Sequence, residues 1–141
     1  MSQTLRPFHI AVPVTDLMAA KDFYGGTLGC TTGRTAERWI DFNFFGHQLT
    51  VHLVDDNNSA IDCNDVDNEQ VPARHFGIVL TMSDWESLSQ KLTGLNTDFV
   101  IEPTIRFKGK TGEQATLFLR DPSGNVLEFK AFADDTMLFA H

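Results

Sequence analysis

Three side chains with the capacity for chemistry stand in otherwise apolar stretches of this 141-residue sequence. Glu128 lies in the run V-L-E-F, while His9 and His75 lie near the start of two other apolar runs, F-H-I-A-V-P-V and H-F-G-I-V-L. A carboxylate among apolar side chains costs free energy unless it is paired or bound to a cation. In the simpler alternative, Glu128 lies on the solvated face of a half-buried strand. A chemical role therefore requires a fold that brings both histidines to the carboxylate.

The first half of the chain predicts one strand, one helix and a hairpin. Arg6–Val14 has the composition of a strand, rich in β-branched and aromatic residues. Apolar residues recur at helical spacing over the stretch 17–28. Two more strands are predicted at Arg38–Phe45 and Gln48–Val54, and Gly46-His47 between them predicts a tight turn and antiparallel pairing.

The segment from Asp55 to Pro72 differs in composition from the rest of the chain. It is acidic, low in aromatic residues, and rich in Asp and Asn. A structureless stretch of this length is usually either functional or disordered. We therefore predict a linker or mobile loop here.

The second half repeats the order of the first, which indicates an internal duplication. A strand at His75–Thr81 precedes a helix whose apolar stripe runs over residues 85–95. A basic loop, Arg106–Gly112, lies among the strands that follow. These strands are predicted at Phe99–Glu102, Gln114–Arg120 and Asn125–Phe132, the last two as a hairpin.

The two halves align on their first histidines and on the turn glycines Gly46 and Gly124. Side chains alternate between the two faces of a strand, so positions two apart share a face. A pseudo-twofold relation would curve the equivalent faces around one cavity, with the two histidines and Glu128 pointing inward beside Thr50. The aligned positions are His9 with His75, Gln48 with Val126, Thr50 with Glu128, and His52 with Lys130.

Composition excludes several kinds of partner. The net charge of −8 argues against nucleic acid and anionic membranes. No apolar run approaches the roughly 20 residues that span a bilayer, and the N-terminus has no signal-peptide core. Two cysteines do not form a disulfide framework. We therefore expect a cytoplasmic protein.

In their order and spacing, three segments resemble the vicinal oxygen chelate superfamily, which includes glyoxalase I, fosfomycin-resistance proteins and extradiol dioxygenases. The resemblance covers roughly residues 7–132. The segments are F-H-I-A-V-P-V with the following D-x-x-x-A-x-x-F-Y, then H-F-G-I-V-L, and finally D-P-S-G-N-V-L-E-F. More narrowly, I-D-F-N-F-F-G-H-Q-L, R-F-K-G and G-E-Q-A-T-L-F resemble small predicted extradiol-type dioxygenases.

The resemblance implies an α+β fold in which two βαβββ modules are related by a pseudo-twofold, with curved mixed sheets around a metal-site cavity. Residues 1–141 would form a single domain, with module one at about 6–54, the acidic linker at 55–72 and module two at about 75–132. Carried over by position, His9, His75 and Glu128 would hold a divalent metal ion. The resemblance also implies a homodimer, which exposed sheet edges favour as well.

Two imidazoles and one carboxylate suit a borderline divalent ion and leave coordination positions open, as in non-haem Fe(II) oxygenases. We expect Fe(II) or Mn(II), although Zn(II) and Ni(II) accept the same ligands. The resemblance to glyoxalase I implies a further carboxylate where this chain has Thr50, so the threonine counts against the glyoxalase reaction. A two-residue slip in the repeat alignment would instead make His52 a fourth ligand.

Other residues are candidates for substrate binding and proton transfer. His52 is predicted to face the cavity as a general acid or base, because imidazole gains and loses a proton near neutral pH. The alternative is a hydrogen-bonded histidine of the sheet. Arg106 and Lys108 are predicted to bind an anionic group of the substrate, with an ordinary solvated loop as the alternative. Thr50 is the third predicted substrate-binding residue.

Three classes of function follow from these expectations. The first is a metal-dependent, ring-cleaving dioxygenase of the extradiol type that acts on a small catechol-like substrate. The second is a metal-dependent lyase, isomerase or thiol transferase, in which the metal acts as a Lewis acid. The third is a metal-free binding protein of the bleomycin-sequestering kind. The histidines and Glu128 disfavour the third class, and one scaffold hosts several reactions.

Overall fold

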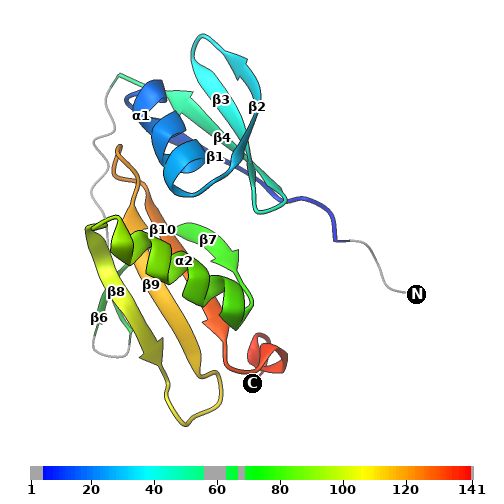
Figure 1. Cartoon of the computed structure of the whole chain (residues 1–141), viewed down its shortest axis with the longest axis vertical. Coiled ribbons are helices and arrows are strands. Elements are labelled where there is room, and N and C mark those ends of the chain that lie inside the picture. The colour runs from blue at the N-terminus through cyan, green and yellow to red at the C-terminus, as the bar shows by residue number, and fades with distance from the viewer. Residues whose placement is uncertain (1–4, 56–62, 67–68, 141) are drawn as a thin grey trace. The chain divides into compact units, whose positions relative to one another are not determined.

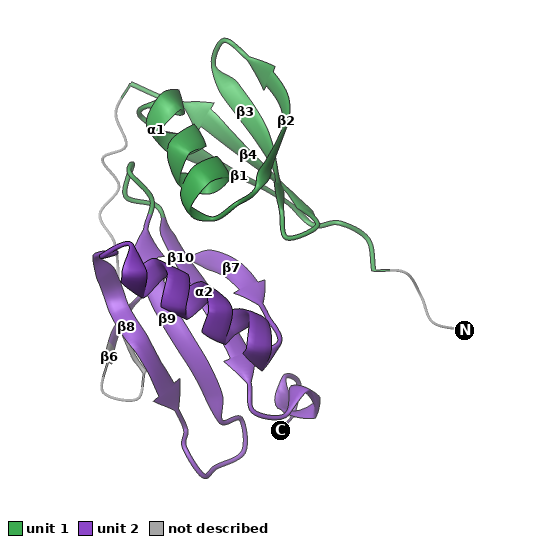
Figure 2. Cartoon of the chain, viewed as in Figure 1, with its two compact units in different colours: residues 1–58, 121–125 green, residues 59–120, 126–141 purple. Residues whose placement is uncertain are grey.

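The computed structural model describes residues 5–55, 63–66 and 69–140. The chain forms two compact units (Figure 2). Unit 1 comprises Met1–Asn58 and Asp121–Asn125, and unit 2 comprises Ser59–Arg120 and Val126–His141. The short turn at 121–125 therefore belongs to unit 1, although the strands that it joins belong to unit 2.

Unit 1 is a four-stranded mixed sheet with one helical layer (Figure 1). The sheet order is β1-β4-β3-β2; β1 and β4 are parallel and the other pairs are antiparallel. Helix α1 (Leu17–Lys21) continues into a π-helical segment, Asp22–Thr27. The strands are β1 (His9–Val14), β2 (Thr31–Ala36), β3 (Trp39–Phe44) and β4 (His47–Leu53).

The alternation of residue types on β3 explains how unit 1 divides its two faces. Ile40, Phe42 and Phe44 are buried, and the residues between them are only partly buried or exposed. Period-two alternation is what a half-buried antiparallel strand requires. Asp16 starts the helix, because its side chain accepts a hydrogen bond from the amide of Ala19 at 3.0 Å.

Unit 2 repeats the same architecture, with the sheet order β7-β10-β9-β8. Strands β7 and β10 are parallel, and the other pairs are antiparallel. The side chain of Thr81 caps helix α2 by accepting from the amide of Asp84. The elements are β7 (Phe76–Val79), α2 (Met82–Gly94), β8 (Phe99–Arg106), β9 (Gln114–Arg120), β10 (Val126–Phe132) and a 3₁₀ turn, Asp135–Met137.

The predicted fold class is confirmed, since the chain has an α+β fold with two βαβββ-like modules and two mixed four-stranded sheets. The acidic segment differs from the prediction, because β5 (Cys63–Val66) and β6 (Glu69–Pro72) pair as an antiparallel hairpin. Val71 gives this hairpin a packing partner on the sheet of unit 2, in a cluster with Ile101, Phe118 and Val126. Residues 56–62 and 67–68 of the predicted linker lie outside the described residues.

The predicted hairpin turn of the first half is displaced by one residue. Phe44 pairs with His47, so Phe45 and Gly46 form the turn rather than Gly46 and His47. Both turn residues have positive φ, 52° and 88°, as a type I′ turn requires. His47 instead belongs to β4, and its Nδ1 accepts a hydrogen bond from the amide of Phe8 at 2.7 Å.

The turn at 121–125 is bonded closely into unit 1. The hydroxyl of Tyr24, a fully buried residue, donates to the carboxylate of Asp121 at 2.8 Å. The side chain of Asn125 donates to the carbonyl of Pro13 at 2.7 Å, and Ser123 Oγ accepts from the amide of Thr15 at 2.9 Å. Burial and the neighbouring Asp121 carboxylate both raise the pKa of Tyr24, so this phenol stays a donor.

Candidate metal site

Two of the three predicted metal ligands meet in unit 2. His75 directly precedes β7, and Glu128 lies on the adjacent strand β10, opposite Gly77. The Nε2 atom of His75 lies 3.3 Å from Oε1 of Glu128. The side chain of His75 is 28% exposed and that of Glu128 is 12% exposed. The carboxylate is therefore largely removed from water but has a partner.

Thr116 holds the second oxygen of the Glu128 carboxylate. Its hydroxyl donates to Oε2 at 2.5 Å, and Thr116 itself is fully buried. An oriented carboxylate loses less conformational freedom when it binds a cation, and such supporting hydrogen bonds tune ligands in metal sites. Thr116 was not among the residues predicted from the sequence.

Gly77 allows β7 to approach β10 at the site. A Cβ atom at this position would lie 1.5 Å from the backbone carbonyl oxygen of Glu128. No real structure accommodates such a contact without moving a strand. The glycine of the H-F-G run is therefore required for the pairing that brings His75 to Glu128.

The electrostatics of the pair favour its charged forms. The hydrogen bond with Glu128 raises the pKa of His75, against the opposing effect of burial. Burial alone would raise the pKa of Glu128, but the hydrogen bonds from His75 and Thr116 and the charge of Lys130 outweigh it. The net shift of the Glu128 pKa is downward. The carboxylate therefore stays ionised near neutral pH, as cation binding requires.

The geometry of the pair also fits two ligands of one ion. Two donor atoms bound to one ion at about 2.1 Å, with angles between about 90° and 109°, lie about 3.0–3.4 Å apart. The distance of 3.3 Å between Nε2 and Oε1 falls within this range. The Nδ1 atom of His75 lies 2.7 Å from the carbonyl oxygen of Pro72, which leaves Nε2 as the nitrogen for a metal.

His9, the third predicted ligand, belongs to unit 1. It is an exposed residue at the start of β1, where it lies opposite Gln48 of β4. In the part of the chain that the structure describes, no three or more His, Cys, Asp or Glu residues are grouped closely enough to hold a metal ion. The ligand set of His9, His75 and Glu128 therefore stays a prediction.

Thr50, the counterpart of Glu128 in the repeat alignment, has a carboxylate beside it. Thr50 is buried, and its hydroxyl donates to Oδ1 of Asp41 at 2.6 Å. The side-chain amide of Gln48 donates through Nε2 to the other oxygen of Asp41 at 3.3 Å. The first-half hairpin thus carries a carboxylate on β3 rather than on β4. Sequence reasoning missed Asp41, although the correct hairpin register places it opposite Thr50.

His52 lies on β4 opposite Trp39, two residues beyond Thr50. The alternation of the strand puts it on the same face as Thr50 and Gln48, as the sequence predicted. His52 is exposed, as an acid or base that meets a substrate must be. Its predicted role in proton transfer is untested.

Arg106 was predicted to open the basic loop Arg106–Gly112, and this placement is wrong, because Arg106 belongs to β8. Arg106 is the last residue of β8, is only 4% exposed, and has its guanidinium carbon 5.9 Å from the ring centroid of Phe118. The ring of His75 lies 5.0 Å from the same centroid. The two distances add to about 11 Å, which is the greatest possible separation between the guanidinium carbon and the centre of the His75 ring. Lys108 lies in the loop and is exposed, and its role in binding an anionic group stays a prediction.

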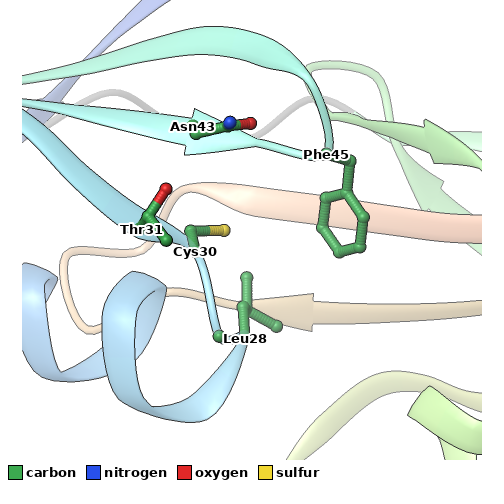
Figure 3. A pocket seen from close by; sticks show the side chains of 6 residues that line it. Leu28, Cys30, Thr31, Asn43 and Phe45 are labelled. Carbon is green, nitrogen blue, oxygen red and sulfur yellow. The ribbon is translucent and has the colours of Figure 1, made fainter.

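Two pockets bear on the choice of site. A cavity of about 220 Å³ in unit 2 is lined by His75, Glu128 and Lys130, together with backbone and side chains of β7. Another, of about 260 Å³ in unit 1, is lined by Leu28, Gly29, Cys30, Thr31, Asn43 and Phe45 (Figure 3).

The residues that line the unit 1 pocket offer few groups that could act in catalysis. None of the described residues that line it carries a carboxylate or an imidazole. Burial raises the pKa of the Cys30 thiol to about 11, so the thiolate that would act as a nucleophile is scarce at neutral pH. The unit 2 cavity is therefore the better candidate.

Comparison with known proteins defines the class of this protein. Residues 6–129 match the model of the Glyoxalase/Bleomycin resistance protein/Dioxygenase superfamily. The chain is similar to the crystal structure of a glyoxalase/bleomycin resistance protein/dioxygenase from Alicyclobacillus acidocaldarius, with 35% identity and a TM-score of 0.82. That similarity covers 99% of this chain and 100% of the other.

Two more distant structures share the fold. Lactoylglutathione lyase from Agrobacterium tumefaciens is 17% identical, with a TM-score of 0.67, over 99% of this chain and 98% of that one. A glyoxalase/dioxygenase from Nostoc punctiforme is 16% identical, with a TM-score of 0.66, over 95% of this chain and 99% of that one. No curated protein matches the chain.

This chain belongs to the glyoxalase/bleomycin resistance protein/dioxygenase superfamily, the vicinal oxygen chelate proteins, as its motifs predicted. Most members of this superfamily are enzymes, and many use divalent metal ions. None of the helices in the described part of the chain is long and apolar enough to cross a membrane.

Proposed function

We propose that this protein is a metal-dependent, ring-cleaving dioxygenase of the extradiol type that acts on a small catechol-like substrate. The observation that carries the proposal is the pairing of His75 with Glu128, at a donor spacing that suits one shared ion. His9 supplies the third ligand, which completes a set of two imidazoles and one carboxylate. Fe(II) or Mn(II) is the metal of choice for this set, and Zn(II) or Ni(II) would also bind.

A bound metal would supply a Lewis acid for two vicinal substrate oxygens and a redox centre for O₂. The chain's own residues do the remaining work. Thr116 orients the Glu128 carboxylate through its hydroxyl. His52 exchanges a proton with the substrate hydroxyl, since its ring is exposed on the open face of β4.

In this proposal the substrate is bound by Thr50, Arg106 and Lys108. The Thr50 hydroxyl donates its hydrogen to Asp41, so its oxygen is left to accept a hydrogen bond from a substrate hydroxyl. The positive charge of the buried Arg106 attracts an anionic group of the substrate. Lys108, two residues later in the sequence, is exposed and adds a second positive charge. A catechol that bears a carboxylate suits this combination best.

A second function, a metal-dependent lyase, isomerase or thiol transferase, has one observation in its favour. Asp41 gives the first-half hairpin a carboxylate beside Thr50, where the three-ligand site was expected to have none. If Asp41 were a fourth ligand, less room would remain for a bidentate diol and O₂. Asp41→Asn distinguishes the two functions: the dioxygenase proposal expects metal affinity to stay within about threefold, whereas a four-ligand site loses it as sharply as Glu128→Gln does.

The main experiment is anaerobic reconstitution with Fe(II), followed by a panel of catechols with and without a carboxylate. We expect O₂ uptake and a yellow ring-fission product, with about one metal ion per chain. Glu128→Gln keeps the shape of the side chain but removes its charge, so metal affinity should fall by more than the roughly 10–100-fold that loss of an outer-shell partner costs. Full metal occupancy in that variant would refute the ligand assignment. Turnover of a thiol adduct without O₂ uptake would establish the second function, and binding of bleomycin-like ligands without metal would establish a sequestering protein.

A further inference from the structure

The β5–β6 hairpin lies on the same face of the unit 2 sheet as the candidate site. Val71 of β6 is 7% exposed and packs in a buried cluster with Ile101, Phe118 and Val126. Phe118 is the cross-strand partner of Glu128, and Val126 lies two residues before Glu128 on β10. The side chains that receive Val71 are therefore the immediate neighbours of the carboxylate.

The same hairpin ends at the imidazole of His75. The carbonyl oxygen of Pro72, the last residue of β6, lies 2.7 Å from Nδ1 of His75. A carbonyl oxygen can only accept a hydrogen bond, so Nδ1 carries the hydrogen in this arrangement. The Phe118 ring packs against the imidazole at 5.0 Å and 72°. Val71 and His75 thus share one aromatic neighbour, while Pro72 and His75 share one hydrogen bond.

We propose that the β5–β6 hairpin positions His75: Val71 anchors the hairpin on Phe118, and the Pro72 carbonyl holds the imidazole with its hydrogen on Nδ1, so that Nε2 faces Glu128. Val71 and Pro72 act through His75 and are positioning residues. Val71 and Pro72, at the end of the acidic segment, are by this inference part of the site.

The chemical consequence concerns which nitrogen is available to a cation. A neutral imidazole carries one hydrogen, on either Nδ1 or Nε2. Without the Pro72 carbonyl, the hydrogen can move to Nε2 and donate to Oε1 of Glu128, which is 3.3 Å away. The lone pair that a metal needs would then be occupied. The docked hairpin removes this competing state. The effect on metal affinity rests on the proposed metal site, whereas the state of the Nδ1 hydrogen does not.

The test uses the full chain and compares Val71→Ala with Val71→Ile. Alanine removes the methyl groups that pack on Phe118, while isoleucine keeps an apolar anchor of similar shape. In the metal-free protein at about pH 5.5, where the imidazole carries both hydrogens, ¹⁵N NMR of His75 reports whether the Nδ1 hydrogen is protected from exchange with water. We expect protection in the wild type and in Val71→Ile, and its loss in Val71→Ala. Titration with Mn(II) should show about a tenfold weaker affinity in Val71→Ala, the lower range for loss of a supporting interaction.

Val14→Ala is the matched control, because it truncates another buried valine, which lies in unit 1. It should lower stability comparably while leaving the Nδ1 hydrogen protected. An unchanged Nδ1 signal in Val71→Ala would overturn the positioning role, whatever the metal affinity. A wild type that binds no Mn(II) would overturn the metal site instead, and the NMR comparison would still decide whether the hairpin positions His75.

Discussion

At the scale of single residues, His52 is the group whose role is most sharply testable. Replacement by Phe removes the titratable nitrogens while keeping a planar ring on the open face of β4. Loss of an acid or base group usually slows turnover by about 10²–10⁴-fold, so we expect that loss in kcat with metal content unchanged. Elemental analysis alongside the kinetics separates the alternatives. If the metal is lost with the ring, His52 is a ligand and the repeat alignment is displaced by two residues.

The His75–Glu128 pair predicts how the stability of the metal-free protein depends on pH. The pKa of His75 is raised above its ordinary 6.5, so its contribution is complete below pH 6.5 and is lost as the pH rises through the folded-state value. The pKa of Glu128 is lowered below its ordinary 4.5, so its contribution is complete above pH 4.5 and is lost as the pH falls. The pair should therefore stabilise the fold most between pH 4.5 and 6.5.

Urea unfolding of metal-free wild type and Glu128→Gln measures this dependence. The difference in unfolding free energy between the two proteins should be larger at about pH 5.5 than at about pH 8.5. Asp84→Asn, a change on the exposed first turn of α2, is the control. Its difference in unfolding free energy from the wild type should be the same at both pH values. Equal differences at both pH values would show that the pair is not an ion pair in solution.

The sequence predicted residues well where two strands repeat the same pattern. His75 and Glu128 could be brought together because the two halves of the chain repeat one order of elements and because the motifs that carry both residues resemble a known family. Asp41 could not be found in the same way. The turn was predicted at Gly46-His47, and this register does not place Asp41 opposite Thr50, whereas the observed register does. The left-handed conformation of Phe45, φ 52°, is uncommon for an aromatic residue, and this concealed the true turn.

At the scale of elements, the close approach of β7 to β10 makes Gly77 the position least tolerant of a side chain. Gly77→Ala places a Cβ against the backbone of Glu128 and should cost about 3 kcal/mol of unfolding free energy, the upper end of the usual cost of overpacking. Urea unfolding measures this cost directly.

Gly94→Ala provides a control of the same chemical change. Gly94 is the last residue of α2 and has open space around the position of a Cβ. Alanine there should leave stability unchanged or raise it by about 0.5 kcal/mol. A Gly77→Ala protein as stable as Gly94→Ala would mean that β7 has no fixed register against β10.

The strands with polar composition were not predicted from the sequence. Every residue of β2 is exposed, so no apolar alternation marks it as a strand. The acidic segment forms β5 and β6 although its composition is typical of a loop, and the burial of Val71 against the unit 2 sheet is a contact that composition does not reveal. Strand β8 continues past the predicted Glu102 to Arg106, because Pro103 is tolerated on an edge strand.

At the scale of the whole molecule, we predict a homodimer. The two sheets present four edge strands, β1, β2, β7 and β8, and unpaired edges are commonly covered by a partner. Light scattering at micromolar concentration should give twice the chain mass of 15.8 kDa. A mass that stays at the value of one chain throughout a dilution series would refute the prediction.

The turn at 121–125 has a consequence for how the protein is made. Translation releases residues 1–58 first, but the contacts that complete unit 1 come from a turn encoded more than 60 residues later. Until Asp121 leaves the ribosome, the Tyr24 hydroxyl lacks the carboxylate that it bonds in the finished protein. A nascent chain that stops before residue 121 therefore lacks the acceptor of the Tyr24 hydroxyl. Unit 1 can complete its folding only after residues 121–125 have been synthesised.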